Sequence, residues 1–254
     1  MTDAPDAMPP LQPGQPPIAV LVDFDGTIAH GDVTAAVMTA NLAPGRELPW
    51  EEGSRLTWPD MMRQAADRFP AEPARLLAAA ARVPLDATFT ALAARASVAR
   101  VAMEVVADGF GFFIGPALEH LGAVWVPIAS GDTRFGPART RVEFPFGNPG
   151  CHVCGTCKRN RVLAHQAAGR RVAFVGDGES DRYAAGYADV VFAKDGLVEI
   201  CEASGVAYRP WASFADVTAW LDEQLAAFSR DPAVLPAPVS RPLFCGPEIW
   251  GPQR

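Results

Sequence analysis

The sequence of 254 residues carries a net charge of −7, with 49% hydrophobic and 20% charged residues. This length allows one large domain or a core with an insert, and the composition is typical of a globular protein rather than a disordered chain. The acidic balance argues against a nucleic-acid partner, because phosphate backbones are bound by clustered Lys and Arg side chains. No stretch approaches the ~20 apolar residues of a membrane span, and the start lacks the pattern of a secretory signal. We therefore expect a cytoplasmic protein without a membrane partner.

Both ends of the chain are rich in proline, which removes backbone donors and favours extended chain. Residues 1–17 and 229–254 are therefore predicted to be tails outside the fold. The second tail contains Phe244, Ile249 and Trp250. Because aromatic side chains are unusual in a free tail, we expect this segment to dock on the core or on a second subunit, as in a homodimer.

Between the tails, short apolar runs alternate with helical patterns. Near-continuous apolar runs are typical of parallel strands that are covered on both faces. The predicted strands are 18–22, 103–107, 124–129, 172–176 and 190–193, and the predicted helices are 112–121, 158–168, 180–186 and 213–228. This alternation predicts a doubly wound, Rossmann-like α/β core that comprises residues 18–31 and 101–228.

Residues 32–100 interrupt the alternation of strands and helices. They lack a convincing strand and are rich in Ala, Leu, Arg and Glu, with several prolines as breaks. We interpret them as a small helical cap inserted after the first strand, where α/β sheets bind their ligands. Trp50, Trp58 and Phe69 more often pack the core of such a cap than contact a substrate. Further on, residues 131–148 are expected to form a hairpin.

Two carboxylates follow the first predicted strand. Residues 20–27 read VLVDFDGT, so that Asp23 and Asp25 lie one residue apart in a glycine-containing turn. Because close carboxylates repel each other, they require a cation, and a set of oxygen ligands suits Mg²⁺. One ionised carboxylate then acts as a nucleophile while the other carries a proton to a leaving group. The alternative interpretation is a turn that only caps the next helix.

A second acidic turn follows the strand predicted at 172–176. Residues 172–181 read VAFVGDGESD, which places Asp177 directly after the strand and Asp181 four residues later. Asp177 is expected to complete the metal site. Asp181 is expected either to hold a metal-bound water or to orient Lys158, although alone it is equally explained as a helix cap.

These motifs resemble the haloacid dehalogenase superfamily in its phosphatase branch. The signatures are Asp-Phe-Asp-Gly-Thr at 23–27 and Gly-Asp-Gly-x-Ser-Asp at 176–181, and the resemblance covers about residues 18–221. The stretches CGTCK at 154–158 and YAAGYADVVFAKD at 183–195 are most similar to the phosphoserine-phosphatase-like subgroup, which includes the methionine-salvage enolase-phosphate phosphatases.

The resemblance implies a magnesium-dependent phosphomonoesterase acting on a small phosphorylated metabolite. It implies that Asp23 attacks phosphorus, that Asp25 protonates the leaving alcohol and then activates water, and that Lys158 neutralises the phosphoryl oxygens. It also implies that Mg²⁺ is held by Asp23, Asp177 and the backbone carbonyl of Asp25, with Asp181 nearby. Phosphoryl transfer requires this kind of positioning and charge neutralisation.

One motif departs from the family pattern. The family's second core strand ends in Ser or Thr, whose hydroxyl binds the phosphoryl group, whereas this sequence has Ala107 there. The backbone N–H groups of Asp108 and Gly109 remain available for phosphate. Loss of one hydrogen bond to a charged group costs ~1.5–3 kcal/mol, which predicts a slower enzyme. A non-catalytic protein that binds a phosphorylated metabolite, and a phosphotransferase using the same residues, stay open as alternatives.

The segment 151–157 contains three cysteines and one histidine. Cys151, Cys154, Cys157 and His152 are candidate zinc ligands, but structural zinc usually draws paired ligands from two separate segments, and no second pair is evident. We favour a shaped loop that presents Lys158.

Overall fold

The computed structural model describes residues 8–41, 57–70, 72–151 and 153–233, and its centre is a seven-stranded sheet with the order β4-β3-β2-β1-β5-β6-β7. Every neighbouring pair is parallel except β3 and β4, which are antiparallel. The predicted Rossmann-like α/β fold is confirmed. The strands are β1 (Ile18–Val22), β2 (Ala102–Phe110), β3 (Ile128–Arg134), β4 (Arg141–Glu143), β5 (Arg171–Gly176), β6 (Val190–Ala193) and β7 (Arg209–Pro210).

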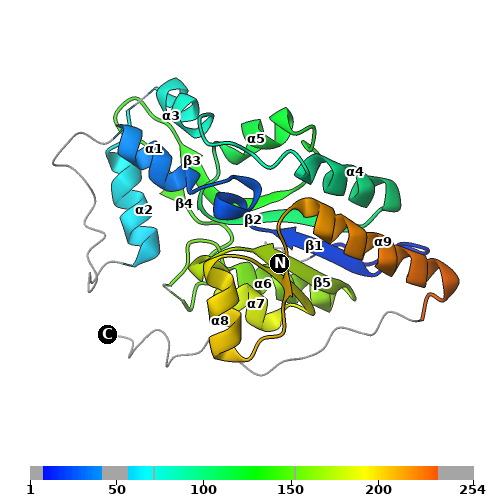
Figure 1. The fold of residues 1–254 in the computed structure, drawn as a ribbon. Helices are drawn as coiled ribbons and strands as arrows, with labels where there is room; N and C mark the ends of the chain where they lie inside the picture. The colour runs from blue at the N-terminus through cyan, green and yellow to red at the C-terminus, as the bar shows by residue number, and fades with distance from the viewer. Residues whose placement is uncertain (1–7, 42–56, 71, 152, 234–254) are drawn as a thin grey trace.

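Helices cover both faces of the sheet (Figure 1). One face carries α4 (Phe89–Ala99), α5 (Ile114–His120) and α9 (Phe214–Arg230), and the other carries α6 (Lys158–Ala167), α7 (Arg182–Tyr187) and α8 (Gly196–Ser204). Successive residues of a strand point to opposite faces, and along β1 they alternate between two separate apolar clusters. This explains why the strand is apolar without interruption. No helix within the described ranges is long and apolar enough to cross a membrane.

The helical insert contains α1 (Val33–Asn41), α2 (Trp58–Asp67) and α3 (Pro73–Ala80), which Figure 1 shows together at one end of the sheet. The next helix, α4, contacts β2 and packs along α9. Its Phe89 ring meets Phe214 edge to face at 5.1 Å. Because α4 belongs to the layer that covers the sheet, we propose a cap that ends before it, rather than at residue 100. Trp50 lies outside the described residues.

The structure corrects the bounds of two predicted strands. β2 continues to Phe110, so Ala107, Asp108 and Gly109 lie within it, beside an irregularity in its pairing with β3. β3 begins at Ile128 rather than Val124, which is 70% exposed. The apolar run before it is a loop, and the true strand, IASGDTR, is too polar to be recognised as a buried strand.

Other elements match or extend the predictions. The expected hairpin within 131–148 is present as the antiparallel pair β3–β4. The predicted helix 180–186 is a short helical turn η2 (Glu179–Asp181) followed by α7. An irregular turn η1 (Phe24–Ile28), helix α8 and strand β7 were not predicted.

The predicted free N-terminal tail is wrong for residues 8–17. The Pro9 carbonyl accepts a hydrogen bond from the Arg170 guanidinium at 2.8 Å, and the Gln15 side chain donates to the Arg100 carbonyl at 2.9 Å. Proline lacks a donor, but its carbonyl remains an acceptor, so a proline-rich segment can still bind a folded surface. The aromatic residues of the C-terminal tail lie outside the described residues.

A buried ion pair joins the sheet to α6. Glu104 of β2 accepts hydrogen bonds from Arg161, the shortest at 2.8 Å, and lies 3.2 Å from Nε2 of His165. All three side chains are at most 5% exposed. Burial has removed water from both charges. Loss of either partner would therefore leave the other charge buried and uncompensated.

We predict that Glu104→Gln destabilises the protein by about 3–5 kcal/mol, since the buried Arg161 guanidinium would lose its counter-charge. Chemical denaturation followed by circular dichroism measures this change. The matched control is Glu143→Gln, whose carboxylate pairs with Arg134 at 3.4 Å on the surface and is 63% exposed. An exposed pair contributes little, so equal losses in the two variants would refute the importance of burial.

Candidate active site

The site lies where two neighbouring parallel strands end. β1 pairs with β5 in register, Val22 opposite Val175, and the next residue of β1, Asp23, donates its backbone N–H to the Val175 carbonyl at 2.9 Å. Asp177 follows the last residue of β5. The two acidic turns, about 150 positions apart in the sequence, therefore meet at one edge of the sheet, as the crevice rule for α/β sheets predicts.

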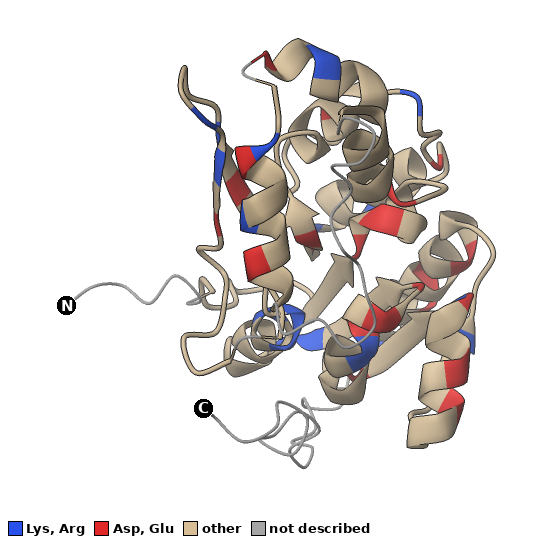
Figure 2. Cartoon of the chain, turned by 90° about the vertical axis from the view of Figure 1, so that its left-hand side faces the viewer, with Lys and Arg blue, Asp and Glu red and all other residues tan. Residues whose placement is uncertain are grey.

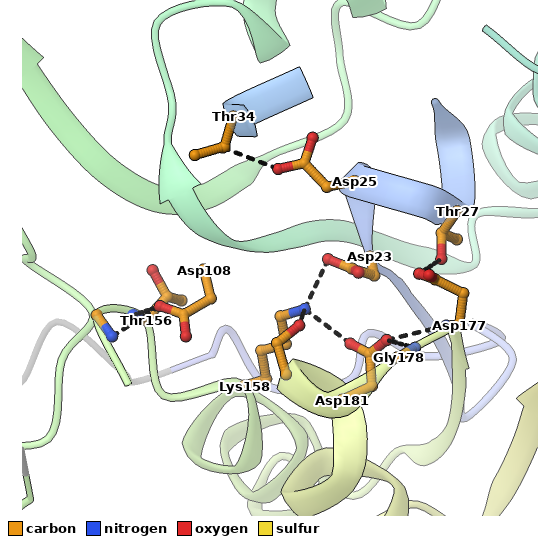
Figure 3. A network of polar contacts seen from close by, with 12 residues as sticks. Asp23, Asp25, Thr27, Thr34, Asp108, Thr156, Lys158, Asp177, Gly178 and Asp181 are labelled. Atoms are coloured by element: carbon orange, nitrogen blue, oxygen red, sulfur yellow. Dashed lines mark hydrogen bonds and ion pairs between the residues drawn. The ribbon is translucent and has the colours of Figure 1, made fainter. Parts of the chain in front are cut away.

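Lys158, the first residue of α6, is the only cation at the centre of this group of described side chains (Figure 3). Its ammonium group donates to Asp23 Oδ1 at 2.6 Å, to Asp181 Oδ1 at 2.7 Å and to the Ser180 hydroxyl at 2.9 Å. An ammonium has three donors, and all three are engaged. The side chain is 2% exposed, so the charge is held almost entirely by these partners.

Asp181 organises the second acidic turn. Its Oδ2 accepts the backbone N–H groups of Asp177 at 2.9 Å and Gly178 at 3.1 Å, while Oδ1 accepts from Lys158. A Cβ on Gly176 would lie 2.4 Å from Asp181 Oδ2, so only glycine permits this approach. With both oxygens engaged, Asp181 orients Lys158 and the turn, one of the two roles expected for it.

Asp177 is held by the first acidic turn. The Thr27 hydroxyl donates to Asp177 Oδ1 at 2.8 Å. Gly26 adopts φ +79°, and a Cβ there would lie 2.1 Å from Asp177 Oδ2. The glycine in this turn is therefore required both by its backbone conformation and by the closeness of the carboxylate.

Three carboxylates fit a hard metal ion. One oxygen from each of Asp23, Asp177 and Asp181 lies within 4.8 Å of the others. They are the only described His, Cys, Asp or Glu residues that converge in this way. An all-oxygen set suits Mg²⁺ or Ca²⁺ rather than a softer metal. The donor chemistry thus agrees with the predicted cofactor.

Asp25 is separate from this cluster and faces the cap. Its Oδ1 accepts the Val33 backbone N–H at 2.9 Å and its Oδ2 accepts the Thr34 hydroxyl at 2.9 Å, both at the start of α1. Burial and the nearby Asp32 carboxylate raise the pKa of Asp25 to about 7, against the opposing effect of these hydrogen bonds. A carboxyl with this pKa is suited to both giving and taking a proton near neutral pH.

The buried charges shift one another. Burial and the Asp181 charge raise the pKa of Asp23 well above its ordinary value, although Lys158 opposes them. Burial and Asp181 raise the pKa of Asp177 to about 6. Burial alone would lower the pKa of Lys158, but Asp181 and Asp23 together raise it above its usual range. Lys158 is therefore charged, but its single positive charge is not enough to neutralise the carboxylates around it.

A cavity of about 730 Å³ opens above these groups between the core and the cap. Asp23, Asp25 and Asp177 lie at its floor, and Asp108 forms part of its wall. The space beside Gly109 is smaller than that beside Asp108, since a Cβ on Gly109 would lie 2.7 Å from the Thr34 hydroxyl. The walls of the cavity also include His30, Asp32, Trp58, Val153, Cys154, Glu179, Tyr183, Lys194 and Asp195.

The cysteine segment lies directly before Lys158. Cys151 and Cys154 are free thiols, and no three metal-ligating atoms that include Cys151, Cys154 or Cys157 converge among the described residues. His152 lies outside these residues.

Sequence reasoning missed three hydroxyl groups: those of Thr27 and Thr34 fix acidic side chains, and that of Ser180 accepts from the Lys158 ammonium. Thr27 and Ser180 are inside the recognised motifs, so their spacing was available as a signal. Thr34 is in the insert, nine residues after Asp25. Only the folded turn brings it to that carboxylate, and no sequence pattern marks it.

Comparisons with known proteins agree with this site. The chain matches the haloacid dehalogenase-like hydrolase family over residues 20–186. The 2-hydroxy-3-keto-5-methylthiopentenyl-1-phosphate phosphatase of Exiguobacterium sibiricum is 28% identical over 207 residues, covering 79% of this chain and 94% of the relative. The phosphatase of the same name from Bacillus cereus is 27% identical over 222 residues, covering 80% and 95%.

Among solved structures, a probable phosphoserine phosphatase from Vibrio cholerae superimposes with a TM-score of 0.60 at 16% identity, covering 89% of this chain and 69% of that one. This likeness supports the fold. The resemblance predicted from the two acidic motifs is confirmed, and the chain belongs to the haloacid dehalogenase-like hydrolase family.

Proposed function

We propose that this protein is a Mg²⁺-dependent phosphomonoesterase that forms an aspartyl phosphate on Asp23. The observation that carries the proposal is the arrangement of Asp23 against the charged Lys158, with the separate carboxyl of Asp25 near neutral pKa. A nucleophile and a group that can exchange a proton are the two parts that the reaction needs from the protein.

The proposed reaction has two steps. A carboxylate oxygen of Asp23 forms a bond to phosphorus while the bond to the leaving oxygen breaks, and the proton of Asp25 passes to that oxygen. Water then loses a proton to Asp25 and attacks phosphorus, which releases phosphate and restores both carboxyl groups. Asp25 must therefore be protonated for the first step and ionised for the second, as a pKa of about 7 allows.

The other residues bind and orient. Lys158 holds the Asp23 carboxylate and places positive charge beside the transferred group. Asp181 and Ser180 fix the Lys158 ammonium, and Thr27 fixes Asp177. Asp23 and Asp177, with the backbone carbonyl of Asp25, would hold Mg²⁺, which neutralises phosphoryl charge when bound.

The cavity favours a substrate whose alcohol portion carries no carboxylate. Beyond the proposed catalytic groups, its described walls present Asp32, Glu179 and Asp195. The Lys194 ammonium lies 4.2 Å from the centre of the Trp211 ring, which satisfies part of its charge. Such walls repel a second anionic group. The substrate named for the two phosphatase relatives has hydroxy, keto and methylthio groups and fits this requirement.

We predict that the protein with MgCl₂ releases phosphate from 2-hydroxy-3-keto-5-methylthiopentenyl-1-phosphate faster than from phosphoserine. We expect Asp23→Asn to lower the rate by more than about 10³-fold, because the amide is not a nucleophile. Phosphate release across a panel of phosphorylated metabolites measures both effects.

Two outcomes of the panel would contradict the proposal. Thermal stabilisation by a phosphorylated metabolite without any turnover would favour the non-catalytic binding protein, an alternative motivated by Ala107. Transfer of phosphate to an added alcohol, with little release to water, would favour a phosphotransferase.

A second prediction concerns the pH dependence of the rate. The Thr34 hydroxyl donates to the ionised form of Asp25 and so lowers its pKa. Thr34→Val removes that donor, raises the pKa, and keeps Asp25 protonated to higher pH. We expect the alkaline limb of the kcat profile to move up by about one pH unit. An alkyl phosphate is the substrate of choice, because its leaving group needs the proton.

The matched control is Thr218→Val on α9, which removes a hydroxyl bonded to the Phe214 carbonyl far from the cavity. Its profile should equal that of the wild type. With p-nitrophenyl phosphate, whose leaving group departs without a proton, the shift should shrink. A limb that stays in place in Thr34→Val with the alkyl substrate would reject Asp25 as the acid.

A third prediction concerns the metal. Gly26→Ala would force a Cβ into the Asp177 carboxylate, at 2.1 Å from Oδ2, from a backbone with φ +79°. We expect Mg²⁺ affinity to fall by at least about tenfold, measured by titration calorimetry. Gly178→Ala is the control in the neighbouring turn, where a Cβ would meet nothing within 4 Å. Equal Mg²⁺ affinity in both variants would place the metal elsewhere.

A further inference from the structure

The cavity wall contains a carboxyl group that the proposed reaction does not use. Asp108 Oδ1 accepts the backbone N–H groups of Gly155 at 2.7 Å and Thr156 at 2.9 Å (Figure 3). These two residues form the turn that leads into α6 and Lys158. The other oxygen, Oδ2, has no hydrogen-bond partner among the described residues, and Asp108 lines the cavity.

The position of Asp108 in β2 decides which side of the sheet it serves. Glu104 contacts Arg161 of α6, and Val106 packs in the same apolar cluster as Val162 of α6. Alternation continues this face to Asp108, as its bonds to the turn before α6 confirm, while Ala107 belongs to the opposite cluster. Asp108 is therefore on the side of Lys158, beside the expected position of the phosphoryl group.

The groups around Asp108 leave the protonated and ionised forms of its carboxyl close in free energy. Burial raises its pKa to about 6, although the Thr156 and Gly155 N–H groups and the Lys158 charge favour ionisation; Asp181 disfavours it. Across the cavity are Asp23 and Asp25, and the Cys154 thiol lies on the loop next to it. A phosphate monoester loses its second proton near the same pH, with a pKa of about 6.

We propose that Asp108 is a binding residue that contacts the phosphoryl group through a shared proton. Oδ1 fixes the turn before Lys158, and Oδ2 meets a phosphoryl oxygen with one hydrogen between them. This inference rests on the proposed phosphoryl site. It assigns to Asp108 the hydrogen bond that a hydroxyl at position 107 would otherwise supply.

The physical reason is charge. An ionised Asp108 beside a phosphate dianion would leave two anions in contact, which is unfavourable in a partly buried site. A single proton between them replaces that repulsion with a charge-assisted hydrogen bond, one of the stronger kinds in proteins. Above pH 6 the proton must come from solvent when the ligand binds, so affinity should fall as pH rises.

The experiment is titration calorimetry with phenylphosphonate and MgCl₂ at several pH values, in buffers of different ionisation enthalpy. The dianion of this ligand, like that of a phosphate monoester, has no hydrogen on oxygen, and its C–P bond is not hydrolysed; inorganic phosphate would bring its own hydrogen. Asp108→Asn keeps an oxygen for the Gly155 and Thr156 N–H groups and offers an uncharged N–H donor on the other side. At pH 8 we expect the wild type to take up about one proton more than this variant. We also expect the variant to bind phenylphosphonate about tenfold or more tightly at pH 8, with the difference vanishing near pH 5.

The control is Asp216→Asn. Asp216 also accepts two consecutive backbone N–H groups, from Ala212 at 2.8 Å and Ser213 at 3.1 Å, but at the start of α9. Asp216→Asn should bind phenylphosphonate as the wild type does. Equal proton uptake in wild type and Asp108→Asn, or weaker binding by that variant at pH 8, would overturn the inference.

A variant that fails to fold leaves the wild-type measurement decisive, because zero proton uptake at pH 8 would also overturn it. The outcome is separate from that of the proposed hydrolysis. Phenylphosphonate binding with the expected proton uptake, but no phosphate release from esters, would reject hydrolysis alone. If the wild type and Asp108→Asn both hydrolyse esters and take up the same number of protons on binding the ligand, only the role of Asp108 is rejected.

Discussion

The contact on which the site depends is the buried ammonium of Lys158 between Asp23 and Asp181. It joins the end of β1, the turn after β5 and the start of α6, which come from three distant parts of the sequence. Each of the three side chains is at most 5% exposed. Removing one partner would leave an uncompensated charge, so this contact fixes the three segments relative to one another.

The sheet makes that contact possible. β1 lies between β2 and β5, so the residues after β1 and β5 emerge side by side at the same edge. The glycines at 26 and 176 then let the backbone come within the distance of a carboxylate, where a Cβ would collide. The strand order therefore brings the two acidic turns side by side. Glycines in those turns then let the backbone approach the carboxylates more closely than any residue with a Cβ would allow.

Sequence reasoning identified the core strands β1, β5 and β6 and the groups Asp23, Asp25, Lys158, Asp177 and Asp181, because near-continuous apolar runs and short motifs are local signals. It misplaced β3, whose polar composition hides a strand, and it took docked residues 8–17 for a free tail. It named Asp108 for its backbone N–H, whereas its carboxyl binds the turn before α6. Such contacts depend on the register of β2 against distant segments, which local patterns do not encode.

Counting charge explains why the three carboxylates and one ammonium favour a divalent ion. Asp23, Asp177 and Asp181 carry three negative charges when ionised, and Lys158 carries one positive charge, which leaves a net charge of −2. The raised pKa values of Asp23 and Asp177 express the same imbalance in the protein alone. A divalent cation would bring the sum to zero, and it would favour the ionised form of Asp23 that the proposed nucleophile requires. The same reasoning extends to Asp108, because a phosphate dianion added to a neutral centre leaves no further positive charge to balance another carboxylate. This charge balance is the reason for which we propose a shared proton at Asp108, in place of the hydroxyl at position 107.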